Sequence, residues 1–301
     1  MFIYLLKYMT EMIDTGETKE KEKELIQKEE FQTEQSSLKS KKRLIILVSI
    51  IILILIVIIS IILIFTRNDD DNNNNGTNND EIEILPPLVQ NSTSGNHTHT
   101  IIFMPGLSNP PEDFKDVFTK RINFTKKNDT TIIILRSPLN YVSVQKSKNY
   151  SWFDIYNFPI NNFSDINLDD LKKSAKVLEK VVNNEVNLLN RNYENIIVGG
   201  HSQGAAISLY QAYTSQKKYG GVFAFSGFLS PGEINDDKRN MKVYFGYGDK
   251  DDVIIPSFIN KTLEKVMNFE GFDLHIYKDH KHYVHENQTT DVGIFLDNLI
   301  K

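Results

Sequence analysis

The sequence predicts an α/β fold for residues 98–301, with a mostly parallel sheet that helices cover on both faces. Three observations support this prediction. Strand-length apolar runs alternate with helix-length segments, which is the pattern of a parallel sheet. These runs are apolar throughout, as expected of strands that are buried on both faces. One run also leads through a glycine-rich turn into a segment of small residues, which suits a helix packed closely against a sheet.

Six short apolar runs are the expected strands. They cover residues 100–103, 130–135, 195–198, 221–225, 242–247 and 273–277. Between the second and the third, apolar residues recur at spacings of three and four, which indicates a helix facing the core. These residues are Leu171, Ala175, Leu178, Val182, Val186 and Leu189. Asn167 stands where a helix N-cap belongs, and Asp169 and Asp170 follow in the first turn, so we expect the helix to begin there.

The first 97 residues are not patterned like a folded domain. Residues 44–65 are apolar except for two serines. A helix of that length reaches about 33 Å, enough to cross a hydrocarbon core of about 30 Å. This predicts a single transmembrane helix at residues 44–66. A charged tail, expected to be cytosolic, precedes it at residues 1–43, and a low-complexity Asp/Asn linker, expected to be disordered, follows it at residues 67–97.

Charges on either side of this span predict its orientation. Lys39, Lys41, Lys42 and Arg43 precede it, whereas Asp69, Asp70 and Asp71 follow it. Because positive charge stays in the cytosol, we expect a single-pass type II membrane protein with residues 98–301 lumenal or extracellular. Nine N-x-S/T sequons lie C-terminal to the span and none precedes it, which suggests a glycoprotein of that topology.

The composition excludes several classes of site and partner. The chain has no cysteine, which excludes disulfides, cysteine-ligated metals and a thiol nucleophile. Its formal net charge of −5 and its pI near 5.8 argue against nucleic acid as a partner. Basic residues cluster beside the apolar run, where they suit anionic lipid better than RNA or DNA.

The pentapeptide Gly200-His201-Ser202-Gln203-Gly204 follows the apolar run at residues 195–198 and precedes the segment of small residues. This order of strand, tight turn and helix is typical of a nucleophile elbow, in which a serine hydroxyl stands exposed above the sheet edge. Glycines on both sides let the backbone turn sharply. We therefore predict that Ser202 is a nucleophile.

A serine hydroxyl is a weak nucleophile at neutral pH, so it needs a base and a carboxylate that orients the base. Two later loops supply both, each after an expected strand. Asp249, Asp251 and Asp252 follow the first, and His280, His282 and His285 follow the second. The alternative for the three imidazoles is a metal site, because neighbouring histidines can ligate zinc. We favour catalysis, because the serine already requires one of them.

Four segments together resemble the acyl-protein thioesterase, or phospholipase/carboxylesterase, family of α/β-hydrolases. They are residues 199–204, 150–154, 248–251 and 277–282, and the resemblance covers nearly all of residues 98–301. It implies an α/β-hydrolase fold in which Ser202 is the nucleophile, Asp251 the orienting acid and His282 the base. Asp252 remains an alternative to Asp251, because the loop that follows is one residue longer than in the family.

The resemblance also implies where an oxyanion would bind. The family uses two main-chain N–H groups, which map to Leu107 and Gln203. The first motif departs from the family pattern, reading Pro-Gly-Leu-Ser at residues 105–108 where the family has His-Gly-Leu-Gly. The proline removes no required donor, because the N–H in question is that of Leu107. Trp152 and Phe153 either line an acyl pocket that binds substrate or anchor a loop in the core.

The apolar span, the serine with its base and acid, and the family resemblance together predict a membrane-anchored serine hydrolase. The resemblance implies that it cleaves acyl thioesters or carboxylic esters through an acyl-enzyme, without cofactor or metal. The substrate would be a lipidated protein or a lipid, with palmitoyl-protein hydrolysis favoured, and residues 44–66 would make the membrane a second partner. A lysophospholipase or general carboxylesterase is the alternative within enzymes. A catalytically silent binding ectodomain on a hydrolase scaffold is the alternative outside them.

Overall fold

The computed structural model describes residues 1–7, 9, 85–188 and 192–300. The chain divides into two units, Met1–Asn78 and Asn79–Lys301. In the first unit, residues 2–7 are helical. The expected membrane helix at residues 44–66 lies outside the described residues, as does most of the tail and linker around it. No helix within the described residues is both long and apolar enough to cross a membrane.

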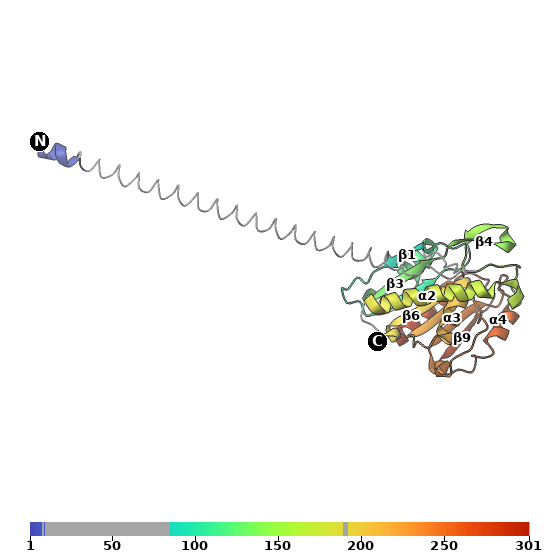
Figure 1. The fold of residues 1–301 in the computed structure, drawn as a ribbon. Helices are drawn as coiled ribbons and strands as arrows, with labels where there is room; N and C mark the ends of the chain where they lie inside the picture. The colour runs from blue at the N-terminus through green and yellow to red at the C-terminus, as the bar shows by residue number, and fades with distance from the viewer. Residues whose placement is uncertain (8, 10–84, 189–191, 301) are drawn as a thin grey trace, which may run out of the picture. The chain divides into compact units, whose positions relative to one another are not determined.

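The second unit is built on a seven-stranded sheet in the order β1-β3-β2-β6-β7-β8-β9 (Figure 1). The strands are β1 (Leu85–Gln90), β2 (His99–Met104), β3 (Thr130–Arg136), β6 (Ile196–His201), β7 (Gly221–Phe225), β8 (Val243–Gly248) and β9 (Phe272–Tyr277). All pairs are parallel except β1 with β3. The six predicted strands are all present, so the prediction of a mostly parallel sheet is confirmed.

Strand β1 lies in the segment that the sequence suggested was a disordered linker. Pro86 and Pro87 lack the N–H that a central strand must donate, so a strand here is compatible only with an edge of the sheet. At the edge of the sheet β1 is paired on one side only, antiparallel to β3, and the register is irregular between Leu85 and Leu88, where the prolines stand. Residues 85–90 are therefore part of the fold rather than of the linker.

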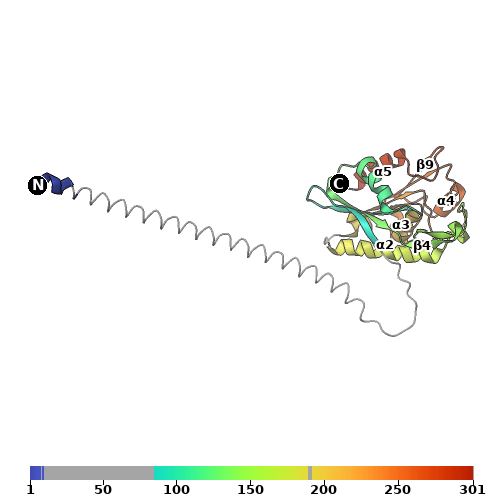
Figure 2. The same ribbon diagram turned by 90° about the horizontal axis from the view of Figure 1, so that it is seen from above.

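Helices cover both faces of the sheet. In the described part of this unit they are α2 (Leu168–Leu188), α3 (Gln203–Thr214), α4 (Pro256–Leu263) and α5 (Glu286–Leu299). Helices α2, α3 and α4 pack on one face, and α5 packs on the other with the short helices η1 (Pro111–Phe114) and η2 (Val117–Arg121) (Figure 2). This arrangement confirms the doubly covered sheet.

Neighbouring residues of a central strand such as β2 face opposite helical layers, which explains why the central strands are buried along nearly their whole length. Ile102 and Met104 of β2 pack on the side of α2 and α3, whereas Ile101 and Phe103 pack on the side of α5. All four side chains are fully buried. Each contributes about 1.5–3 kcal/mol of burial free energy, so both layers hold the strand that leads to the active-site loops.

Helix α2 begins where the sequence predicts. The side-chain oxygen of Asn167 accepts hydrogen bonds from the main-chain N–H groups of Asp169 and Asp170, both at 3.1 Å. These bonds satisfy two of the N–H groups that the first turn of a helix leaves without partners. The apolar stripe then faces the core, with Leu171 and Leu178 fully buried.

The segment between β3 and α2 holds elements that the sequence did not suggest. Strands β4 (Leu139–Val142) and β5 (Ser147–Tyr150) form a separate hairpin. Asp154 holds its turn, because its carboxylate accepts hydrogen bonds from the Ser143 N–H at 2.7 Å and the Ser143 hydroxyl at 2.5 Å. The short helices η4 (Ser143–Gln145) and η5 (Phe163–Asp165) lie in the same segment. Elsewhere in the described residues are the short helices η3 (Lys127–Asp129), η6 (Tyr193–Asn195) and η7 (Asp236–Asn240).

Substituting Gly204→Ala tests how closely α3 must approach β2. A Cβ at this position would overlap the main-chain oxygen of Met104, which cannot yield without moving the strand. We expect the free energy of unfolding to fall by about 3 kcal/mol, at the upper end for overpacked cores, as measured by chemical denaturation. Gly95→Ala is the control, because nothing lies within 4 Å of its Cβ and only a φ of 77° opposes it. Equal losses in the two variants would contradict the close approach.

Candidate active site

Ser202 stands at the sharp turn between β6 and α3. Its backbone has φ 56° and ψ −115°, a conformation that residues other than glycine rarely adopt. Its N–H donates to the carbonyl of Phe225 at 2.9 Å, which ties the turn to the end of β7. A Cβ on Gly200 would overlap the main chain of Gly204, so both glycines are needed for the turn to close. The local geometry is that of a strained nucleophile elbow.

The structure brings Ser202, His282 and Asp251 into one hydrogen-bonded chain. His282 Nε2 lies 2.8 Å from Ser202 Oγ, and His282 Nδ1 lies 2.8 Å and 3.0 Å from the two carboxylate oxygens of Asp251. A carboxylate only accepts hydrogen bonds, so Nδ1 carries the proton and Nε2 is left to accept from the serine hydroxyl. His282 is therefore in the tautomer that can take a proton from Ser202.

Asp251 and Asp252, the two alternatives for the acid, have different surroundings. Asp251 is buried, and its Oδ1 also accepts from the N–H groups of Val253 at 3.0 Å and Ile254 at 2.8 Å. Asp252 is exposed and forms an ion pair with Lys281 at 2.8 Å. The geometry thus favours Asp251 over Asp252 as the partner of His282.

His280 and His285 belong to the same loop as His282 but are not part of the hydrogen-bonded chain. Their rings stack on each other, with centroids 3.4 Å apart. Both ring nitrogens of His282 already have protein partners, so it has no nitrogen left to join them in the metal site considered as an alternative. In the described part of the chain, no group of three His, Asp or Glu side chains is arranged to hold a metal ion.

The two residues predicted to supply oxyanion donors belong to segments that adjoin Ser202. Leu107 follows Gly106, and a Cβ built on Gly106 would come within 3.0 Å of the Ser202 Cβ, so this loop lies against the serine. Gln203 is the first residue of α3, where an N–H has no acceptor within the helix. The partial positive charge of the helix N-terminus also favours an anion there.

Trp152 and Phe153 are each 1% exposed and belong to the hydrophobic core. The indole N–H of Trp152 donates to the carbonyl of Pro105 at 2.9 Å. The side-chain amide of Gln203 accepts from the Trp152 N–H at 3.0 Å and donates to the Phe153 carbonyl at 2.7 Å. These contacts correspond to the loop anchor, the second of the two roles considered for this pair.

The side chain of Gln203 is a structural link that the sequence did not reveal. The family resemblance implies a role for its main-chain N–H only, yet its side-chain amide is buried and joins α3 to residues 151–153. The sequence offered one indication of this role, because Gln203 is a long amide side chain among small residues at the start of α3. Through Trp152, this link continues to Pro105 and so to the loop that carries Leu107.

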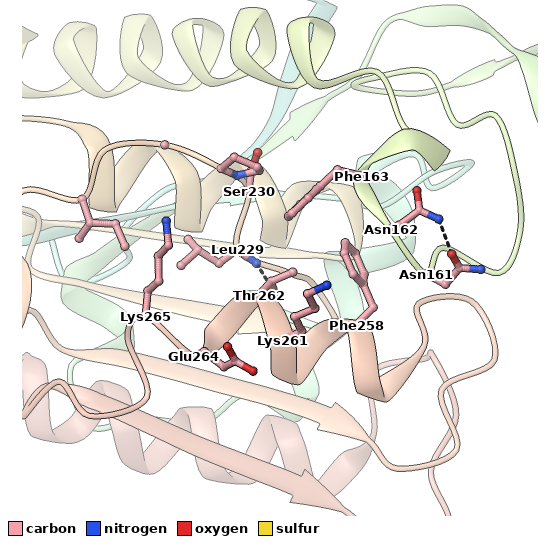
Figure 3. Close-up of a pocket in the computed structure, with 13 residues that line it drawn as sticks. Asn161, Asn162, Phe163, Leu229, Ser230, Phe258, Lys261, Thr262, Glu264 and Lys265 are labelled. Atoms are coloured by element: carbon pink, nitrogen blue, oxygen red, sulfur yellow. Dashed lines mark hydrogen bonds between the residues drawn. The ribbon is translucent and has the colours of Figure 1, made fainter.

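A cavity of about 260 Å³ lies apart from the triad (Figure 3). Its exposed lining is mostly apolar, with Phe163 and Phe258 between the asparagines Asn161 and Asn162 at one side and Lys265 at the other. The lining residues are Asn161, Asn162, Phe163, Leu229, Ser230, Pro231, Gly232, Ile234, Phe258, Lys261, Thr262, Glu264 and Lys265. Leu229 lies four residues beyond Phe225, so their Cα atoms are at most about 14 Å apart. The carbonyl of Phe225 in turn accepts a hydrogen bond from the Ser202 N–H.

Comparison with known proteins identifies the family. The model of the phospholipase/carboxylesterase family matches residues 87–300. The chain belongs to this family. Acyl-protein thioesterase 1 of Debaryomyces hansenii is 26% identical over 73% of this chain and 99% of the relative. Acyl-protein thioesterase 1 of Kluyveromyces lactis is 31% identical over 50% of this chain and 69% of the relative.

Solved structures agree on the fold. Arabidopsis thaliana SOBER1 has a TM-score of 0.61 at 16% identity, covering 67% of this chain and 99% of its own. Acyl-protein thioesterase 2 of Zea mays has a TM-score of 0.57 at 19% identity, covering 71% and 99%. At such identities the likeness establishes the α/β-hydrolase fold alone. Family and fold together make this chain a serine hydrolase of the carboxylic ester class, similar to acyl-protein thioesterases.

The predicted localisation is wrong. We expected a single-pass type II membrane protein with the hydrolase domain lumenal or extracellular, but the relatives are acyl-protein thioesterases, and that of Debaryomyces hansenii aligns almost completely with only 73% of this chain. It offers no counterpart to the remaining quarter. Flanking charges orient a span only if it inserts, so they cannot by themselves establish a topology. The membrane as a partner and the glycoprotein assignment depended on that topology and find no support.

Trp152→Phe tests the anchor role of this residue. Phenylalanine keeps most of the buried ring but loses the donor to the Pro105 carbonyl, so the loop with Leu107 is held less firmly. We expect kcat for ester hydrolysis to fall about tenfold, by the same factor for acetyl and long-chain esters. Steady-state kinetics on both esters provides the measurement. A loss confined to long chains would instead assign Trp152 to acyl binding.

Proposed function

We propose that this protein hydrolyses acyl thioesters of lipidated proteins through an acyl-enzyme on Ser202, with His282 as base and Asp251 as orienting acid. The observation that carries the proposal is the hydrogen-bonded chain from Ser202 through His282 to the buried Asp251. The names of the relatives, acyl-protein thioesterases, support this class of substrate.

The first half of the reaction forms the acyl-enzyme. Ser202 Oγ attacks the acyl carbonyl carbon while His282 Nε2 takes the hydroxyl proton, and Asp251 stabilises the imidazolium that results. The N–H groups of Leu107 and Gln203 bind the oxyanion of the tetrahedral intermediate. The bond from carbon to the leaving sulfur then breaks, and the thiol leaves with the proton from His282.

The second half releases the acid. A water molecule loses a proton to His282 Nε2 and attacks the acyl carbonyl, and the same two N–H groups hold the second oxyanion. The carbon bond to Ser202 Oγ breaks as the proton returns to that oxygen. The products are a carboxylic acid and the regenerated serine. Oxygen esters follow the same course with an alcohol as leaving group, so a lysophospholipase or carboxylesterase activity of this site is the second candidate, favoured by the family's name.

The triad roles are tested by Ser202→Ala and Asp251→Asn. We expect each to reduce kcat/KM about 10⁴-fold, because triad members act as a unit. The matched control is Asp252→Asn, which removes only an exposed ion pair with Lys281 and should stay within twofold of the parent. Hydrolysis of a thioester and labelling by a fluorophosphonate probe are the measurements. Parent-like activity in a folded Ser202→Ala protein would refute the mechanism.

The cavity of Figure 3 is proposed to hold the far end of a long acyl chain. Its wall at Leu229 lies within about 14 Å of Phe225, whose carbonyl is a further 2.9 Å from the Ser202 main-chain nitrogen. A long acyl chain spans such a distance and an acetyl group does not. Phe163 and Phe258 offer an apolar surface, with rings 5.1 Å apart. Each methylene buried contributes about 0.8 kcal/mol, or up to about fourfold in kcat/KM.

Acyl-chain selectivity tests this part of the proposal. In a matched series of thioesters and oxygen esters from acetyl to palmitoyl, kcat/KM should rise with chain length until the cavity is full. Ile234→Trp narrows the cavity and should weaken only the long chains. Ile276→Trp adds the same bulk at an exposed position of β9 and should change neither end of the series. A flat profile would favour the short-chain carboxylesterase.

A further inference from the structure

His201 immediately precedes Ser202, and its side chain reaches the loop that carries the base. The ring is buried, and its Nε2 lies 2.8 Å from the main-chain oxygen of His282. A carbonyl oxygen only accepts hydrogen bonds, so Nε2 carries the proton and donates. His201 therefore holds the main chain of His282, and the side chain of His282 accepts the proton of Ser202.

The surroundings of His201 hold its ring in this orientation. Its centroid lies 5.9 Å from that of Phe114 and 5.1 Å from that of His282. The loop of Gly106 is also close, since a Cβ built on that residue would stand 3.0 Å from His201 Nδ1. This Nδ1 is buried without a hydrogen-bond partner among the described residues. The bond from Nε2 is therefore the hydrogen bond that orients the ring.

His201 donates this bond while uncharged. Burial, and then the nearby imidazole of His282, lower the pKa of His201 to about 3, although the His282 carbonyl and the Asp251 carboxylate act in the opposite direction. The ring is therefore neutral at any pH near neutrality. A neutral donor fixes the backbone of His282 without placing a second positive charge beside the imidazolium that forms during catalysis.

Other contacts hold the base loop on either side of His282. The carbonyl of His280 accepts from the Lys250 N–H at 2.9 Å, and the carbonyl of Val284 accepts from Arg121 Nη2 at 2.9 Å. These bonds tie the loop to the Asp251 loop and to η2. The bond from His201 ties the loop to the nucleophile elbow, at His282, the residue that accepts the proton.

We infer that His201 is a positioning residue, which sets the main chain of His282 relative to Ser202 and so keeps the base within hydrogen-bond reach of the nucleophile. The inference rests on the proposed function. Its physical basis is the sensitivity of proton transfer to distance, since a displacement of about 1 Å can cost about 100-fold in rate. The donor at Nε2, and not the aromatic ring as such, performs this task.

Two variants of the full chain separate the donor from the ring. His201→Phe keeps a ring against Phe114 but has no donor, whereas His201→Gln has no ring but carries an N–H group the same number of bonds from Cβ. Rates are expressed per Ser202 that reacts with a fluorophosphonate probe, so that loss of folded protein does not count as loss of activity. The substrate is an octanoyl thioester, and melting temperatures are recorded for each variant.

We expect His201→Phe to lower kcat per reactive serine about 10- to 100-fold, to leave KM within twofold, and to slow probe labelling by the same factor as kcat. His201→Gln should recover kcat to within about threefold of the parent. A purely structural role would lower the melting temperatures of both variants and leave kcat per reactive serine unchanged. His201→Leu provides a second variant without a donor if phenylalanine prevents folding.

Two outcomes would overturn the inference. One is a parent-like kcat per reactive serine in the folded variants without a donor, and the other is an equal loss in His201→Gln and His201→Phe. Ser202→Ala in the same assay separates this failure from that of the proposed function. If Ser202→Ala is inactive while His201→Phe is fully active, only the positioning role is lost. If Ser202→Ala hydrolyses the thioester normally, the proposed mechanism fails as well.

Discussion

The close approach of α3 to the sheet is the constraint on which the rest of the site depends. Neither Gly200 nor Gly204 has room for a Cβ, and the turn between them holds Ser202 at a φ of 56°. Such a conformation costs about 1–3 kcal/mol for a residue with a side chain and persists only where the surroundings enforce it. Here the enforcement comes from the contact of Gly204 with the Met104 main chain at the end of β2. The strain at the serine and the packing of the helix are thus one feature.

The elbow also organises the loops around it through the two side chains that flank Ser202. His201 binds the main chain of His282, and Gln203 binds residues 151–153, from which Trp152 reaches the Pro105 carbonyl. The base and the Leu107 loop therefore take their positions from the same three consecutive residues. Because both links are buried side-chain hydrogen bonds, breaking either leaves an unpaired polar group in the core, which costs about 1–3 kcal/mol.

Much of the fold follows from periodicity, because strands buried on both faces and a helix with a single apolar stripe leave strong patterns. The six parallel strands were predictable for that reason, whereas the start of α2 followed from the capping residue Asn167 and the family from four short motifs. Strand β1 was not, because its prolines are compatible with a strand only at an edge, and a sequence does not state where the edge lies. The choice between Asp251 and Asp252 also needed the structure, since loop conformation decides which of two adjacent carboxylates faces inward. The burial of Trp152 and Phe153 could not be predicted either, because a pair of aromatic residues gives the same sequence pattern whether it lines a pocket or packs in the core.

Charge explains why the neighbours of the triad are arranged as they are. Asp251 is a buried carboxylate that accepts hydrogen bonds from His282 Nδ1 and from two main-chain N–H groups. These three donors stabilise its negative charge. During the reaction His282 becomes positive, and the carboxylate compensates that charge. A protonated side chain at residue 201, with its ring 5.1 Å from that of His282, would oppose the same step. A neutral, buried imidazole supplies the required hydrogen bond and avoids the repulsion, which neither lysine nor arginine could do at this position.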